Sequence, residues 1–171
     1  MYTVIEGGVT AAAGFQTAST AAGIKYKNRK DMAMIYSEKP CKAAGTFTTN
    51  IVKAAPVKWD QKIVKESEYA QAVVINAGIA NACTGAEGMG YCAETAQAAS
   101  AALKVPESAV LVASTGVIGM QLPMDKLKAG IAAMAPELSG TIDDVTDSIE
   151  DVLLRLYMFN IRTLRPEAQA F

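Results

Sequence analysis

The sequence contains no histidine in its 171 residues. Histidine is the commonest general base near neutral pH and the commonest metal ligand, so its absence removes two large classes of site at once. Ser-His-Asp triads, Cys-His dyads and zinc sites built on histidine are excluded within this chain. Any catalysis by these residues therefore depends on hydroxyls, amines, carboxylates or backbone N–H groups.

Cysteine is scarce as well. The three cysteines, Cys41, Cys83 and Cys92, form no CxxC pair, and an odd number leaves one unpaired, so we expect no disulfide framework. Cys83 lies near a predicted helix start, where the pKa of a thiol can fall, but a nucleophilic cysteine needs a base that the sequence does not offer. We therefore predict that Cys83 and Cys92 are small buried thiols.

Long apolar runs and an excess of charge of either sign are also missing. No apolar run approaches the ~20 residues of a membrane-spanning helix, and the start lacks the features of a signal peptide. Sixteen basic and seventeen acidic residues leave a formal net charge of -1, which attracts neither nucleic acid nor an anionic membrane. We expect a soluble, cytoplasmic protein of one domain, or one domain plus part of another, whose partners are small molecules or proteins.

The apolar runs predict a β-rich opening followed by alternating helices and strands. Strand-like runs come first, at 3–5, 31–37 and 45–50. The later elements are a helix over 58–71, a strand over 72–78, a helix from about 87, a strand over 109–113, a helix over 125–134 and a helix from 141. This alternation places the chain in the α/β or α+β class.

Four basic residues crowd one short segment before the strand at 31–37. They are Lys25, Lys27, Arg29 and Lys30, with Tyr26 as the single aromatic residue among them. We interpret the segment as a solvated hairpin tip. A patch that binds phosphate is the alternative, although one aromatic residue gives little support for nucleic-acid binding.

Two further clusters have ordinary structural explanations. Gly85, Gly88 and Gly90 lie between a strand and a helix, but their G-x-x-G-x-G spacing is not the dinucleotide fingerprint and no P-loop lysine follows. We predict a tight turn into a closely packed helix, with a nucleotide site as the remote alternative. A set of carboxylates surrounds the polar face of the last predicted helix, where solvation and capping explain it and no metal site is expected: Asp143, Asp144, Asp147, Glu150 and Asp151.

The stretch VLVASTGVIG, at 110–119, ends a buried strand in small residues. Thr115 can offer a hydroxyl donor, and the Gly116 N–H can be approached closely because no Cβ shields it. Fixed donors of this kind are what an oxyanion hole requires. A simple turn is the alternative explanation of the same residues.

Four motifs follow one another along the chain: EGGVTAAAGF (6–15), the segment from AAGIKYKNRK to NIVKAAPV (21–57), VVINAGIANACTGAEG (73–88) and VLVASTGVIGMQLPM (110–124). Together and in this order they resemble the N-terminal part of the ornithine acetyltransferase family, the bifunctional glutamate N-acetyltransferases of arginine biosynthesis. The resemblance covers residues 1–146 and implies a layered α-β-β-α sandwich, of which this chain holds a part. Within the third motif, we expect the Asn76, Asn81 and Thr84 side chains to fix the loop by hydrogen bonds to the backbone.

The resemblance also implies an activity. Family members cut themselves before a threonine, which then carries an acetyl group from N-acetylornithine to glutamate, and some accept acetyl-CoA as a co-substrate. Thr115 and Gly116 match the family's oxyanion hole, so the resemblance assigns them that catalytic role. It further implies a β chain as partner in a heterotetramer, and no cofactor or metal.

Residues 147–171 depart from the family pattern. Up to residue 154 the chain uses twelve lysines and one arginine, whereas 155–171 contain three arginines and no lysine. Thr163 has no alanine before it, so we do not assign it as the nucleophile. We hypothesise that the chain is a truncated or frame-shifted α portion with a divergent tail at 147–171. The chain as a whole then lacks the threonine nucleophile. The alternative is an inactive remnant or a non-catalytic binding module.

Overall fold

The computed structural model describes residues 8–140. The strand predicted at 3–5, the helix from 141, the acidic cluster and Thr163 lie outside this range. The predictions made for them therefore stay predictions.

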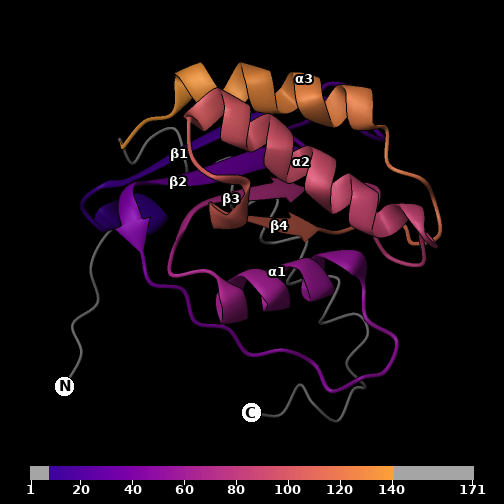
Figure 1. The fold of residues 1–171 in the computed structure, drawn as a ribbon. Helices are drawn as coiled ribbons and strands as arrows, with labels where there is room; N and C mark the ends of the chain where they lie inside the picture. The colour runs from indigo at the N-terminus through magenta and orange to yellow at the C-terminus, as the bar shows by residue number, and fades with distance from the viewer. Residues whose placement is uncertain (1–7, 141–171) are drawn as a thin grey trace, which may run out of the picture.

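Four strands form one mixed sheet in the order β1-β2-β3-β4 (Figure 1). These are β1 (Phe15–Thr20), β2 (Met32–Cys41), β3 (Ala70–Asn76) and β4 (Val110–Ser114). β1 pairs with β2 and β2 with β3 in antiparallel fashion, whereas β3 and β4 are parallel. The parallel pair is connected through a helix, as a parallel pair requires.

Three helices pack against the sheet: α1 (Ala55–Glu66), α2 (Glu87–Leu103) and α3 (Met124–Met134). α3 packs on β1 and β2, α2 on β3 and β4, and α1 on β4 and α2 (Figure 1). Short 3-10 turns occupy Val9–Ala11, Glu107–Ala109 and Ala135–Glu137. The predicted α+β class is therefore confirmed.

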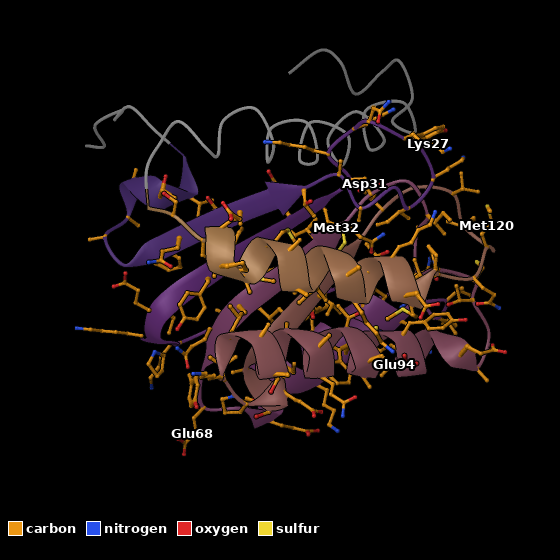
Figure 2. The ribbon with its side chains drawn as sticks, turned by 90° about the horizontal axis from the view of Figure 1, so that it is seen from above. Lys27, Asp31, Met32, Glu68, Glu94 and Met120 are labelled. Carbon is orange, nitrogen blue, oxygen red and sulfur yellow. The ribbon has the colours of Figure 1, made fainter. Side chains whose placement is uncertain are left out.

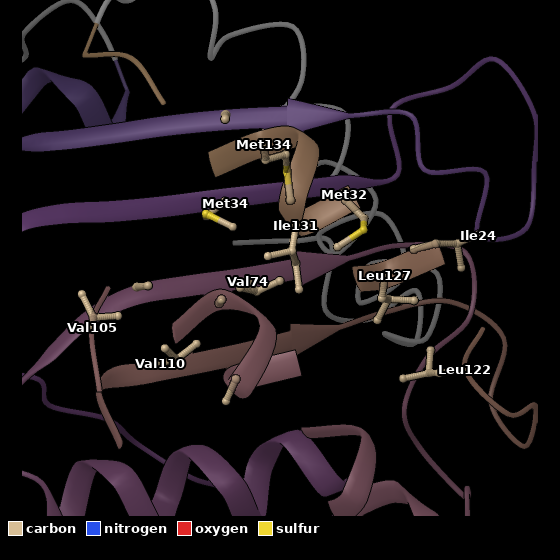
Figure 3. Packing of buried hydrophobic residues seen from close by; sticks show 14 of the residues in the cluster. Ile24, Met32, Met34, Val74, Val105, Val110, Leu122, Leu127, Ile131 and Met134 are labelled. Atoms are coloured by element: carbon tan, nitrogen blue, oxygen red, sulfur yellow. The ribbon is translucent and has the colours of Figure 1, made fainter. Parts of the chain in front are cut away.

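The main core lies between the helices and the sheet. Alternate strand residues face the helices, because side chains along a strand point to opposite faces in turn. Figure 3 shows the strand residues Met32, Met34, Val74 and Val110 in one buried cluster with Leu127, Ile131 and Met134 of α3. The intervening residues form a second apolar cluster centred on Ala33, Ile75 and Ala77. A sheet with apolar side chains on both faces suits a layered arrangement.

Helix α1 also supplies hydrogen bonds to β4, the strand at one end of the described sheet. The Trp59 indole Nε1–H donates to the Val110 carbonyl at 3.0 Å, and the Val112 N–H donates to Asp60 Oδ1 at 3.0 Å. Unpaired backbone groups on an outer strand invite association with other chains. Two side chains of α1 satisfy such groups here.

Two strand predictions failed. The segment 45–50 is largely exposed and forms no strand, because its β-branched residues have no neighbouring strand to pair with. Strand β1 was missed, since FQTAST contains only one large apolar residue. Helix α1 begins before the predicted 58, with Pro56 in its first turn, and ends at Glu66, so that Ala70 can begin β3.

None of the helices in residues 8–140 is both long enough and apolar enough to span a membrane.

Candidate functional site

The ends of β3 and β4 bring two loops together at one edge of the sheet. Because the two strands are parallel, their carboxyl ends lie side by side, with Asn76 opposite Ser114. The pairing continues past the strands in an isolated bridge between Ile79 and Val117. The Val117 N–H donates to the Gly78 carbonyl at 3.1 Å, which holds the two loops at a fixed distance.

Gly116 lies directly against Gly78. Its φ is +130°, and an added Cβ would lie 2.3 Å from the Gly78 carbonyl carbon and 2.7 Å from the Ile79 nitrogen. No side chain fits there, and the backbone conformation itself disfavours any residue but glycine. The glycine is therefore required by the close approach of the two loops.

Two donors at this corner are unused by the described residues. The Thr115 N–H donates to the Asn76 carbonyl at 3.0 Å, but neither the Thr115 hydroxyl nor the Gly116 N–H makes a hydrogen bond there. Thr115 as a whole residue is 9% exposed. Donors held by a rigid backbone and left without a partner can stabilise negative charge on a bound oxygen.

A network around Asn81 holds the first of the two loops. The Asn81 N–H donates to Ser114 Oγ at 2.8 Å, and its side-chain amide donates to the Gly88 carbonyl at 2.9 Å. The Thr84 hydroxyl donates to Asn81 Oδ1 at 2.7 Å, and the Asn76 amide donates to the Ile79 carbonyl at 2.8 Å. The expected anchoring role of Asn76, Asn81 and Thr84 is confirmed, except that Thr84 bonds a side chain rather than the backbone.

The glycine-rich segment is a turn into a tightly packed helix, as predicted. Gly85 has a φ of +68°, and Gly88 is buried where a Cβ would meet Thr84 Oγ1 at 2.5 Å and Ala55 Cβ at 3.1 Å. Gly90 has open space around it. Of these three glycines, Gly88 is the one that the close packing at the start of α2 requires.

The cysteines differ from one another in exposure. Cys92 is 1% exposed in the core, and burial, with the nearby Asp60 carboxylate, raises the pKa of its thiol to about 12. Cys83 is exposed and has a φ of +56°, so the prediction of a buried thiol was wrong. The reason is that the tight loop after β3 turns this side chain outward. Cys41 is partly exposed. No group of three potential metal ligands occurs within residues 8–140.

The basic segment connects β1 to β2, as predicted for a hairpin tip. Lys25, Lys27 and Lys30 are exposed and Arg29 is half-buried. Since β2 begins opposite the end of β3, with Met32 paired to Asn76, this segment lies at the same edge of the sheet as the two loops. In Figure 2, Lys27 and Met120 appear at the same end of the molecule, away from Glu68.

Sequence reasoning missed two residues that build this edge. Asp31 is 6% exposed and accepts hydrogen bonds from the Ala22 and Ile24 N–H groups at 2.8 and 2.6 Å. Gly78 forms the surface against which Gly116 packs. The signal for Gly78 is that the segments 75–79 and 113–117, INAGI and ASTGV, share one pattern, so equal register places glycine against glycine. Asp31 leaves no comparable signal.

Comparison with known proteins gives one consistent result. The model of the ArgJ family matches residues 16–154. The arginine biosynthesis bifunctional protein ArgJ of Gloeobacter violaceus is 46% identical over 140 residues, which cover 82% of this chain and 34% of that protein. The protein of the same name from Thermotoga neapolitana is 49% identical over 127 residues, which cover 74% of this chain and 32% of the relative. The chain thus spans about one third of the length of the curated relatives it matches.

Two solved structures share the fold. The arginine biosynthesis bifunctional protein of Bacillus halodurans superposes with a TM-score of 0.79 at 38% identity, over 85% of this chain and 75% of that one. The ornithine acetyltransferase of Mycobacterium tuberculosis, solved with ornithine, also gives a TM-score of 0.79, at 44% identity over 83% of this chain and 76% of that one.

Proposed function

This chain belongs to the ArgJ family, and from that premise we propose that it supplies the oxyanion-stabilising part of an acetyltransferase that moves an acetyl group from N-acetylornithine to glutamate. The observation that carries the proposal is the corner at the end of β4. There the Thr115 hydroxyl and the Gly116 N–H are fixed donors without partners among the described residues. The ornithine complex of the Mycobacterium tuberculosis enzyme supports a substrate of this class.

Acetyl transfer needs such donors when the tetrahedral intermediate forms. A nucleophilic oxygen bonds to the acetyl carbon, and the carbonyl oxygen takes up negative charge in the tetrahedral intermediate. The Thr115 hydroxyl and the Gly116 N–H donate to that oxygen and lower the barrier. The intermediate then collapses, the C–N bond to ornithine breaks, and the amine leaves with a proton. Glutamate's amine attacks the acyl-enzyme through a second intermediate of the same charge.

The nucleophile in this proposal is the threonine of a second segment, the β chain, and the assembled enzyme is a heterotetramer. Residues 147–171 are proposed to contain a divergent tail after a family-like part at 1–146; the family model matches as far as residue 154, so the tail begins between about residues 147 and 155. The absence of histidine suits a threonine nucleophile, whose own terminal amine acts as the base. The expected cytoplasmic location and the use of acetyl-CoA stay predictions.

Reconstitution tests the proposal. The 171-residue chain is assayed for acetyl transfer from N-acetylornithine to glutamate, alone and after co-expression with the part of the Thermotoga neapolitana relative that follows its matched segment. We expect no turnover by the chain alone and turnover by the pair. Failure of the pair to assemble or to turn over supports the inactive remnant or binding module instead. Turnover by the chain alone would show that the nucleophile lies within it.

A further inference from the structure

A cavity of about 580 Å³ lies at the edge of the sheet opposite to the Thr115–Gly116 corner. Its lining includes Tyr69, which directly precedes β3, and Glu107, which lies shortly before β4. These are the amino ends of two parallel strands, whereas Thr115 follows the carboxyl end of β4. Figure 2 shows Glu68, another lining residue, at the end of the molecule away from Met120. The cavity has the volume of a small-molecule site and is separate from the proposed oxyanion site.

Part of the lining is aromatic and apolar. Ile63 is 5% exposed, and Trp59 packs against the main core. The Trp59 indole Nε1–H donates to the Val110 carbonyl at 3.0 Å, which fixes the indole in place. The second ring of the lining, that of Tyr69, belongs to a half-buried residue. The cavity therefore offers rings for stacking, one of which needs no further ordering when a ligand binds.

The rest of the lining is mainly acidic. Glu66, Glu68 and Glu107 are exposed, and Lys62 is the one basic residue beside them. Among residues 8–140 a single ion pair is found, between Lys128 and Glu94, so these four side chains form no ion pair in that part of the chain. Three carboxylates and one ammonium leave two negative charges around the cavity, although the whole chain has a formal net charge of only -1. A concave surface of one sign concentrates the opposite charge.

Rings together with carboxylates favour a flat organic cation. The carboxylates do not converge on one point, since no group of three potential metal ligands occurs in the described range 8–140. A guanidinium group is planar, lies well against an aromatic ring, and donates to a carboxylate through two parallel N–H groups. A primary ammonium supplies the charge without the flat surface. The lining therefore favours a guanidinium over a metal ion or a simple amine.

We propose that this cavity is a binding site for a small organic cation of the guanidinium class. The guanidinium lies against the Tyr69 ring and donates to the surrounding carboxylates, while Trp59 and Ile63 form the apolar wall behind it. The site goes beyond the proposed function, because it lies at the other edge of the sheet and uses none of the residues assigned to acetyl transfer. It exists whether or not the chain takes part in that reaction.

The test is isothermal titration of the 171-residue chain with agmatine, which carries a guanidinium, an ammonium and no carboxylate. The variant E66Q/E68Q/E107Q removes the three carboxylates of the cavity, and E87Q/D125N/E137Q removes three exposed carboxylates elsewhere as a matched control. We expect agmatine binding to weaken about tenfold or more in the cavity variant and to stay unchanged in the control. Wild-type affinity should fall as the salt concentration rises. Circular dichroism confirms that both variants fold.

A second set of measurements tests the rings and the separateness of the site. Tyr69→Leu removes a ring and should weaken agmatine binding about threefold, whereas Tyr69→Phe keeps the ring and should bind as the wild type does. N-carbamoylputrescine, in which an uncharged urea replaces the guanidinium, should bind more weakly than agmatine. Thr115→Val should leave agmatine binding unchanged, because Thr115 lies at the other edge of the sheet.

Several results would overturn the proposal. No binding of agmatine by the wild-type chain, equal affinity in the cavity variant, or an equal loss in both triple variants would each do so. Equal binding of N-carbamoylputrescine would remove the guanidinium from the account. Displacement of agmatine by an equal concentration of Ca²⁺ would assign the carboxylates to a metal ion. Tighter binding of a short acetylated peptide containing arginine would assign the cavity to a polypeptide partner instead.

Discussion

At the scale of single residues, Gly116 has the least freedom to change. Its φ of +130° and the 2.3 Å between an added Cβ and the Gly78 carbonyl carbon leave no room for alanine. We expect Gly116→Ala to lower the free energy of unfolding by about 2 to 4 kcal/mol, because the two loops must separate. Urea denaturation measures this change.

Gly90 provides the matched control for that substitution. It lies in α2 with open space around it, so Gly90→Ala should raise stability by about 0.5 to 1 kcal/mol, since alanine favours helix over glycine. If Gly116→Ala were as stable as the wild type, the close packing of the two loops would be wrong.

The three thiols should differ in reactivity. At pH 8 we expect Ellman's reagent to modify Cys83 first, then Cys41, and Cys92 only when the chain unfolds, because Cys92 is buried and the pKa of its thiol is raised to about 12. Mass spectrometry of the labelled peptides assigns each site. Rapid labelling of Cys92 in native conditions would contradict the packing of α2 on the sheet.

At the scale of elements, α1 covers the outer side of β4. Burial of the Asp60 carboxyl in α1 lowers the free energy of unfolding by an amount that depends on pH. Burial raises the pKa of Asp60 from 3.8 to about 6, and the hydrogen bond from the Val112 N–H opposes this only in part. Between these two pH values the folded protein holds more protons than the unfolded chain. The contribution of Asp60 to stability therefore falls as the pH rises through this window and is constant above it.

Asp60→Asn should remove this dependence. The amide oxygen still accepts the Val112 N–H, while no charge is buried, so the variant should be more stable than the wild type by about 2 to 3 kcal/mol at pH 7 and nearly equal to it near pH 4. Denaturation curves at pH 4, 5, 6 and 7 give the comparison, with the exposed Glu137→Gln as control. An equal difference at all four pH values would contradict the shifted pKa.

The sequence predicted the elements whose side chains show a clear period. The helix from 87, the strand at 109–113 and the helix over 125–134 correspond to α2, β4 and α3 within one residue at most ends. Strand β1 could not be predicted, because its small and polar residues are held by pairing with β2 and by packing under α3 rather than by their own pattern. The exposed segment 45–50 shows the opposite case: its residues favour a strand, but no neighbouring strand pairs with it.

In the candidate site, too, some features follow from the local sequence and others depend on contacts between distant segments. Small residues that interrupt a buried strand point to Thr115 and Gly116, the family resemblance assigns them the oxyanion role, and that role stays a prediction. The contact of Gly116 with Gly78, and the proximity of the basic segment between β1 and β2, depend on the register of β2, β3 and β4. Separate segments of the sequence do not reveal that register.

At the scale of the whole molecule, the chain covers about one third of the length of its curated relatives. Its sheet carries apolar side chains on both faces, and the main core with its three helices lies on one of them. In the proposed function the chain contributes donors for an oxyanion, whereas the nucleophile belongs to another segment. The proposed function therefore depends on the role of Thr115 in the assembled enzyme.

The most direct measurement is the steady-state kinetics of Thr115→Val and Thr115→Ser in the reconstituted enzyme with N-acetylornithine and glutamate. Valine keeps the shape of threonine without its hydroxyl, and serine keeps the hydroxyl. The account predicts that Thr115→Val lowers kcat by about 100-fold or more with little change in KM, because the donor acts on the oxyanion rather than on the bound substrate, and that Thr115→Ser restores most of the rate. An unchanged kcat in Thr115→Val would contradict it.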